Sequence, residues 1–285
     1  MQRKGYTLAM IVASAQSAVP LLSLASVLAY LAAAGVSHAR QRLGHGGSVL
    51  LGTAAVLHAL VIALGLTHPL RFGFGPALSM TALLALLAYA IESRNYALQQ
   101  LRWRLALIGA VTVLLAWLFP GPLLQSPASE WLPLHLALGV ASYGLFAVAV
   151  LHAWLMSRAE LRMRDGPALL QEDAATSTPM LPLLTLERLT FRFVTLGFIL
   201  LTITIVQGWL FGEQLYGLTG GWRWSHKTIF SLLSWLVFAA LLWGRWRLGW
   251  RGSRAVRMVY AGASLLLLSY VGYHFVLEVL LRRLS

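Results

Sequence analysis

Residues 48–66 read SVLLGTAAVLHALVIALGL and decide the fold class. The stretch carries no Asp, Glu, Lys or Arg. At the helical rise of about 1.5 Å per residue it is long enough to cross the roughly 30 Å hydrocarbon core of a bilayer. The whole chain is 59% hydrophobic and 11% charged, whereas soluble domains carry about 25% charged residues. The sequence therefore predicts a polytopic membrane protein.

Similar apolar runs recur along the chain. Because helices satisfy their own backbone hydrogen bonds in lipid, we predict an all-α transmembrane bundle without a soluble domain. The short alternating segments of a membrane β-barrel are absent from the sequence. We place about eight spans at residues 7–34, 48–66, 76–91, 103–119, 133–156, 191–212, 226–243 and 257–281. Pro20 lies inside the first span and predicts a kink there.

The distribution of basic residues predicts the orientation of the chain. The odd-numbered loops hold fifteen Lys and Arg, the even-numbered loops three and the termini four. Since cytoplasmic loops carry the excess of basic residues, the odd loops are assigned to the cytoplasm. In a bacterial inner membrane both termini would then lie on the periplasmic side, with the bilayer as the first partner of the chain.

The longest loop, residues 157–190, mixes charges with Gly, Pro, Ser and Thr and reads as a cytoplasmic linker. It divides the chain into an N-terminal five-helix half, 1–156, and a C-terminal three-helix half, 191–285. We expect the whole chain to form one membrane domain.

Net charge and cysteine content exclude several functions. A charge of +13 in a soluble protein would indicate nucleic-acid binding, but here the arginines lie in short loops beside membrane spans. We therefore predict no nucleic-acid partner. The absence of cysteine excludes disulfides, thiolate chemistry and Fe–S clusters. No acid–base pair is evident, so we do not expect an enzyme.

Three histidines stand out among the apolar spans. His58 lies mid-span, and it can either ligate a metal or join two helices by hydrogen bonds as a neutral imidazole. His135 begins the fifth span, above a face of small and aromatic residues suited to close helix packing or to the edge of a flat ligand. His274 lies in the last span at a depth similar to that of His58. His152, by contrast, is expected at the cytoplasmic interface.

The segment GGWRWSHKTIFSLLSWL, residues 220–236, concentrates aromatic and basic side chains at the outer start of the seventh span. Tryptophan, lysine and arginine are enriched at membrane interfaces, which is the simplest explanation. The alternative is a site for a flat, apolar and anionic ligand. Tryptophan rings would stack on such a ligand, and cations would meet its carboxylates.

The order of these residues resembles the cytochrome c assembly family of the CcsA and CcmC type. That family carries W-x-W-D-P-K-E, an apolar run with W-L, and then G-W-R-G-R-R-A. The matching residues here are Trp222, Trp224, Lys227, Trp235, Leu236, Gly249, Trp250, Arg251, Gly252 and Arg254. LHLALGVASYGLFAVAVL is similar to another family helix, with His135, Tyr143 and Phe146 matching. The resemblance covers most of residues 130–285 and is closest to the compact inner-membrane subgroup of the YpjD and HemX type.

The resemblance implies a haem-binding inner-membrane protein that binds or presents haem near its outer face during cytochrome c biogenesis, with other maturation components as partners. It implies iron ligation by His135 and His58, with His274 as the alternative, since histidine is an axial ligand of haem. The remaining implied contacts to haem come from Trp222, Arg223, Trp224, His226 and Lys227.

The chain departs from the family pattern at the D-P-K-E position, where it reads Ser225, His226, Lys227, Thr228. The family's second outer histidine falls near Arg282 and Arg283, which leaves His274 two turns earlier. The main alternative is a non-catalytic regulatory or scaffolding membrane protein of the HemX type, which acts on tetrapyrrole synthesis or on another membrane partner and docks that partner on the 157–190 loop. A small transporter using His58 and His274 is disfavoured, because mid-span acids and an inverted repeat are not seen.

Overall fold

The computed structural model describes residues 2–39, 45–66, 71–96, 98–123, 131–164, 182–211, 225–276 and 279. Over these ranges the chain is almost entirely helical, and the extended structure is limited to an isolated bridge between Arg71 and Leu123. The predicted all-α class is confirmed.

Helical structure covers the described residues of each predicted span, apart from one or two residues at the ends of some spans. The long helices are α1 (Gln2–Ala39), α2 (His45–Gly65), α3 (Phe74–Glu92), α4 (Arg102–Leu118), α5 (Leu132–Arg164), α7 (Leu183–Leu210), α9 (His226–Leu248) and α10 (Gly252–Leu267). The short elements are the 3-10 turn η1 (Gln99–Leu101), the π-helix η2 (Leu268–Gly272) and α11 (Tyr273–Phe275). Within the described ranges, seven helices are long and apolar enough to cross a membrane. The eighth, α4, has 17 residues.

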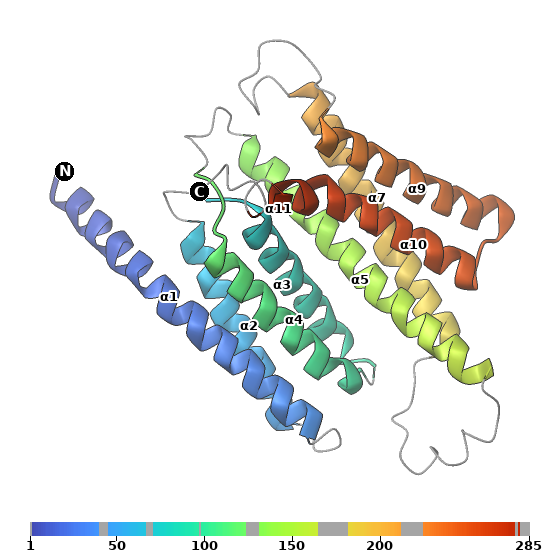
Figure 1. Ribbon diagram of the computed structural model, residues 1–285, viewed down its shortest axis with the longest axis horizontal. Coiled ribbons are helices and arrows are strands. Elements are labelled where there is room, and N and C mark those ends of the chain that lie inside the picture. The colour runs from blue at the N-terminus through green and yellow to red at the C-terminus, as the bar shows by residue number, and fades with distance from the viewer. Residues whose placement is uncertain are drawn as a thin grey trace. The chain divides into compact units, whose positions relative to one another are not determined.

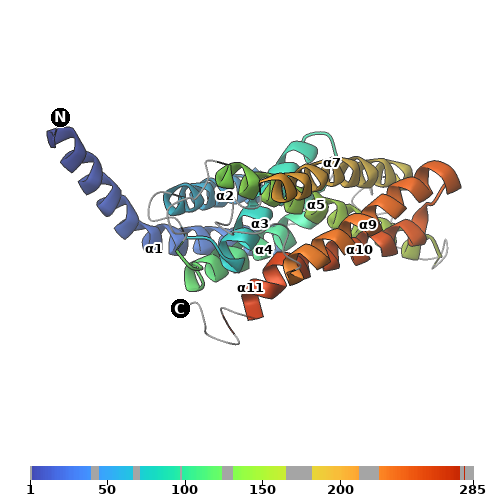
Figure 2. The same ribbon diagram turned by 90° about the horizontal axis from the view of Figure 1, so that it is seen from above.

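Two helix ends differ from their predicted positions. The fifth helix continues to Arg164 and the sixth begins at Leu183, so both flanks of the predicted 157–190 linker are helical. The charged residues at 157–164 and 183–190 end the apolar pattern in the sequence, but charged side chains do not interrupt a helix. Pro20 lies inside α1, and Figure 2 shows this helix bent in its first half, as expected for an internal proline.

The described helices pack as two compact units. Unit 1 comprises residues 1–86, 98–125 and 274–285, and unit 2 comprises 87–97 and 126–273. In unit 1, α1 packs along both α2 and α4, and the three run side by side in Figure 1. Gly109 of α4 lets α1 approach closely, because an added Cβ would lie 2.7 Å from the Tyr30 ring.

In unit 2, α5 runs antiparallel to α7, and α9 packs against α10 (Figure 1). Glycines again set the close approaches. An added Cβ on Gly197 would lie 3.1 Å from the Phe146 ring, and one on Gly262 would lie 2.7 Å from the Phe238 ring. The two phenylalanine rings stack with centroids 3.9 Å apart. This small-to-large matching is the usual way in which membrane helices pack.

The turn between α9 and α10 contains the G-W-R-G residues. Gly249 ends α9 in the left-handed conformation, with φ of 64°, and this geometry favours glycine. The Trp250 amide donates to the Gly244 carbonyl at 3.2 Å, and the indole covers the Gly244 backbone. The motif therefore forms a turn that ends α9 and brings Arg245 of α9 close to Arg251 of the turn.

Candidate functional site

His58 is fully buried in unit 1 and joins three helices. Its Nδ1 lies 3.0 Å from the Tyr30 hydroxyl of α1, and its Nε2 lies 2.7 Å from the Ser79 hydroxyl of α3. A neutral imidazole has one donor and one acceptor nitrogen, and hydroxyls can do both, so either tautomer satisfies this chain. The geometry matches the helix-joining interpretation of His58. To bind iron, the ring would have to release one hydroxyl.

His135 lies in the first turn of α5, where that helix meets the last turns of α7. An added Cβ on Gly208 would lie 3.5 Å from the His135 Cε1, so the ring rests against the α7 backbone. The His135 Nδ1 is buried, whereas the residue as a whole is half-buried. The buried Gln207 side chain lies within hydrogen-bonding reach of the imidazole. This edge of the ring is therefore fixed by α7.

Aromatic rings lie at the same end of α5 and α7. The Trp131 and Phe211 rings stack with centroids 5.3 Å apart and an interplanar angle of 13°. Deeper along α5, the predicted face is occupied by helix packing. Ser142 donates to the Gly197 carbonyl at 3.1 Å, and Tyr143 donates to the Leu266 carbonyl. At Ser142 and Tyr143, the face below His135 therefore makes helix–helix contacts, as expected for close helix packing and not for a ligand edge.

The start of α9 explains the departure from D-P-K-E. Ser225 is the N-cap, and its hydroxyl accepts from the Thr228 amide at 3.3 Å. The Thr228 hydroxyl lies 3.1 Å from the Ser225 hydroxyl. Asp and Ser are both favoured N-caps, proline is favoured at the next position, and Glu at the third closes a capping box. The substitutions therefore retain a capped helix start, with His226 exposed at the first position.

Lys227 and Trp235 face neighbouring helices. The Lys227 ammonium lies 5.1 and 4.9 Å from the ring centroids of Tyr270 and Tyr273, and the Lys227 carbonyl accepts from Ser269 at 2.9 Å. The Trp235 indole stacks on Phe198 and donates to Thr202 at 2.9 Å. These contacts tie α9 to η2 and to α7.

The other predicted site residues divide into two groups. His274 is buried in α11, directly after the π-helix η2, and π-helical turns are frequent at functional sites. Trp222, Arg223 and Trp224 lie outside the described residues. The roles predicted for all of these side chains in haem binding stay predictions.

Sequence reasoning missed a buried pair in unit 2. His152 is 1% exposed, and its Nε2 lies 2.9 Å from Glu92 Oε2. Its Nδ1 lies 2.9 Å from the Val148 carbonyl, and the ring stacks on Phe193. His152 was expected at the interface because two turns further on α5 becomes charged. Its burial follows from a partner on α3, some 60 positions away, which no local pattern reveals.

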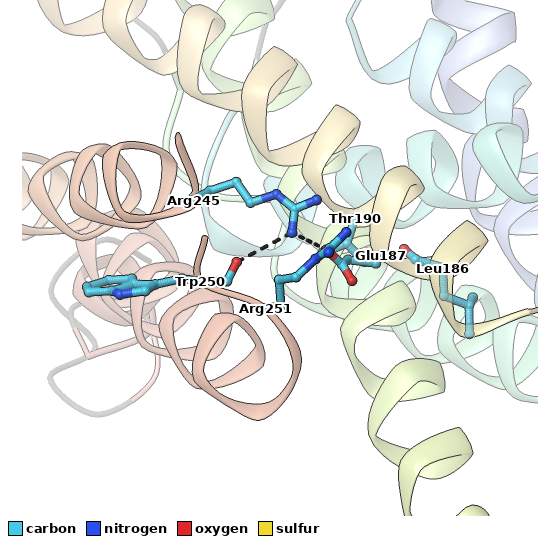
Figure 3. Close-up of polar contacts among 6 residues, drawn as sticks. All are labelled: Leu186, Glu187, Thr190, Arg245, Trp250 and Arg251. Carbon is cyan, nitrogen blue, oxygen red and sulfur yellow. Dashed lines mark hydrogen bonds and ion pairs between the residues drawn. The ribbon is translucent and has the colours of Figure 1, made fainter. Parts of the chain in front are cut away.

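The second missed feature joins three elements through Glu187 (Figure 3). Arg245 of α9 and Arg251 of the following turn both approach the buried Glu187 carboxylate of α7. Arg251 donates through Nε at 2.9 Å, and Arg245 also donates to the Trp250 carbonyl at 3.5 Å. The sequence contains both partners, Glu187 in the PLLTLERLTFR stretch and Arg251 in the G-W-R-G motif. That they pair could be seen only from the packing of α7 against the turn after α9.

A family model described as "Cytochrome C assembly protein" matches residues 14–281. The chain belongs to the cytochrome c assembly protein family. Its assignment from His135, the tryptophan segment and G-W-R-G is therefore confirmed, and so is its character as a multi-span membrane protein.

Among the relatives of this chain, "Inner membrane protein YpjD" of Escherichia coli (strain K12) is 29% identical over 153 residues, 54% of each chain. "Cytochrome c biogenesis protein CcsA" of Synechococcus sp. (strain RCC307) is 30% identical over 171 residues, 53% of each chain. The same protein from strain CC9902 is 31% identical over 171 residues, 53% of this chain and 54% of its own. The chain thus matches about half the length of these relatives. No solved structure matches it.

Proposed function

We propose that this family member is a non-catalytic haem-handling protein of the bacterial inner membrane, which binds or presents haem near its outer face. The observation that carries the proposal is the His135 imidazole at the rim of α5, held on one edge by α7. Ligand histidines are commonly oriented by a hydrogen bond from their second ring nitrogen, and Gln207 is the side chain within reach of His135. The arrangement fits haem, whose iron accepts a histidine nitrogen as an axial ligand.

In this proposal each residue near the rim has a distinct task. His135 supplies Nε2 to the iron, while α7 fixes the Nδ1 edge. On haem binding, the Gln207 carbonyl would accept a hydrogen bond from Nδ1 and keep the ring in one tautomer. The stacked Trp131 and Phe211 offer an apolar wall at the same end. Both nitrogens of His58 already face hydroxyls, so His58 would have to give up one of these contacts to bind iron.

The test is a haem titration of the full chain, purified in detergent and followed by the Soret band. We expect the wild type to give a saturable Soret band and His135→Ala to bind haem at least about tenfold more weakly, a loss of about 1.4 kcal/mol. His38→Ala is the matched control, since that ring packs on Trp103 in unit 1. A wild type without a Soret band, or equal binding by His135→Ala, would refute the proposal.

A second prediction concerns Gln207 as a positioning residue. Gln207→Leu removes the acceptor beside His135 and is expected to weaken haem binding about tenfold, in line with losses of outer-shell partners at metal sites. It should also alter the ligand-field bands in the visible spectrum. Gln207→Glu, which keeps an acceptor, should restore both.

The control for Gln207 is Thr204→Val, about one turn away on α7, where the hydroxyl is bonded to the Leu200 carbonyl of its own helix. We expect this variant to titrate like the wild type. A Gln207→Leu protein with an unchanged spectrum and affinity would remove Gln207 from the site.

A further inference from the structure

The end of unit 2 opposite His135 is strongly basic. Here α5 and α9 end while α7 and α10 begin, as the Ser253–Glu160 bond at 3.1 Å and the Glu187 cluster show. Among the described side chains of these elements at this end, eight arginines stand against two glutamates, Glu160 and Glu187. The arginines are Arg158, Arg188, Arg192, Arg245, Arg247, Arg251, Arg254 and Arg257. Both glutamates have partners, so a positive excess remains.

Three of these arginines are oriented by separate contacts. Arg251 donates to Glu187 through Nε, and its side chain is 60% exposed. Arg257 donates through Nε to the Ser253 carbonyl at 3.4 Å, and the Arg254 guanidinium lies 5.5 Å from the Trp250 ring centroid. A guanidinium held through Nε keeps its two terminal NH2 groups for another acceptor. Arg251 and Arg257 are therefore fixed while their outer donors remain available.

The three arginines all lie at the start of α10. Arg251 is the N-cap of this helix, and Arg254 and Arg257 follow in its first two turns, three residues apart and therefore neighbours on the helix surface. All three are exposed. Arg245 differs, because it is half-buried and bonded to both Glu187 and Trp250 through one nitrogen. Arg245 thus neutralises the charge of Glu187, and the charge of Arg251 remains as a net positive charge.

The surroundings identify the kind of anion. The last turns of α9 expose Trp243 by 59%, Trp246 by 74% and Leu248 by 58%, beside the same turn. Exposed tryptophans next to arginines mark the level of lipid head groups on a membrane helix. A ligand that has both a phosphate and acyl chains would satisfy the two surfaces together, whereas a soluble anion would use only the arginines.

We propose that Arg251, Arg254 and Arg257 form a binding site for the phosphate of an anionic phospholipid. Guanidinium groups bind phosphate oxygens in a bidentate manner, and basic clusters between membrane helices bind anionic head groups. Glu187 acts as a positioning residue, since it holds Arg251. The lipid would brace the ends of α7, α9 and α10, and this role is independent of haem.

The test measures binding of fluorescent phosphatidylglycerol to the delipidated full chain in detergent. We expect the variant Arg251→Gln/Arg254→Gln/Arg257→Gln to bind about 100-fold more weakly, because each substitution removes a charge-assisted contact to the phosphate. The control Arg158→Gln/Arg188→Gln/Arg192→Gln removes the same charge at the same end and should lose less than about fivefold. Phosphatidylcholine should bind both variants and the wild type equally weakly.

Three outcomes would overturn the proposal. An equal loss in the control variant would mean that the end attracts anions without a defined site. Competition by millimolar inorganic phosphate as effective as that by unlabelled phosphatidylglycerol would assign the arginines to a soluble anion. Unchanged binding by the first variant, with retained helicity by circular dichroism, would place the lipid elsewhere.

Discussion

Glu92→Ala is expected to lower the free energy of unfolding by about 3 kcal/mol, measured by reversible denaturation in detergent micelles. Removing one member of a buried hydrogen-bonded pair leaves the other member without its partner, at a cost of about 3–5 kcal/mol for a full charge pair. The Glu92–His152 pair is buried, with side-chain exposures of 10% and 1%. Because Glu92 lies at the end of α3, we expect a loss at the lower end of this range.

The hydrogen-bond pattern of His152 explains why this carboxyl matters. The Val148 carbonyl can only accept, so the His152 Nδ1 must carry a proton. The Nε2–Glu92 contact then needs one further proton, held by either partner. The pair is neutral as a whole in both states, and this neutrality lets it remain buried. Without the carboxyl, the buried Nε2 loses this partner.

Two variants separate this explanation from simple loss of volume. Glu92→Gln keeps a donor for Nε2 and should cost less than about 1 kcal/mol, because the hydrogen bond survives without charge. The double variant Glu92→Leu/His152→Phe removes both polar partners and should recover most of the loss seen in Glu92→Ala. If Glu92→Gln were as damaging as Glu92→Ala, the contact with His152 would not be the source of the stability.

The spans could be predicted because lipid imposes a single strong requirement on each of them. A run such as residues 48–66 must be a helix, since no other conformation satisfies its backbone in hydrocarbon. Helix ends were harder to place. The residues near Arg164 and Leu183 mix charged and apolar side chains. Both helices nevertheless extend beyond their apolar runs into these residues. Hydropathy reports the apolar run, not the helix.

The candidate site was only partly predictable. Spacing marked His135, but its neighbour Gln207 comes from a helix some 70 residues away, and no local pattern joins them. Ser225 appeared to be a loss from D-P-K-E until its cap to Thr228 showed that the helix start is retained. The pairs His152–Glu92 and Glu187–Arg251 depend on which helices become neighbours, and that order is set by packing over the whole unit.

His58→Leu is expected to destabilise the chain by about 2 kcal/mol while leaving haem affinity within about twofold of the wild type. Leucine has a similar volume, so the loss comes mainly from Tyr30 and Ser79, whose hydroxyls lose the imidazole. Hydrogen bonds between membrane helices contribute about 0.6 kcal/mol on average and up to about 1.7. Two such bonds, both lost from a fully buried residue, account for the estimate.

The apolar triple variant Tyr30→Phe/His58→Leu/Ser79→Ala is the control, because it removes the orphaned hydroxyls together with the imidazole. It should regain most of the lost stability. The opposite result would come from a ligand role: His58→Leu would lose the Soret band, whereas Tyr30→Phe and Ser79→Ala, which each free one ring nitrogen, would keep or strengthen it. Stability and haem binding are measured independently. Together they decide whether His58 joins α1, α2 and α3 or binds iron.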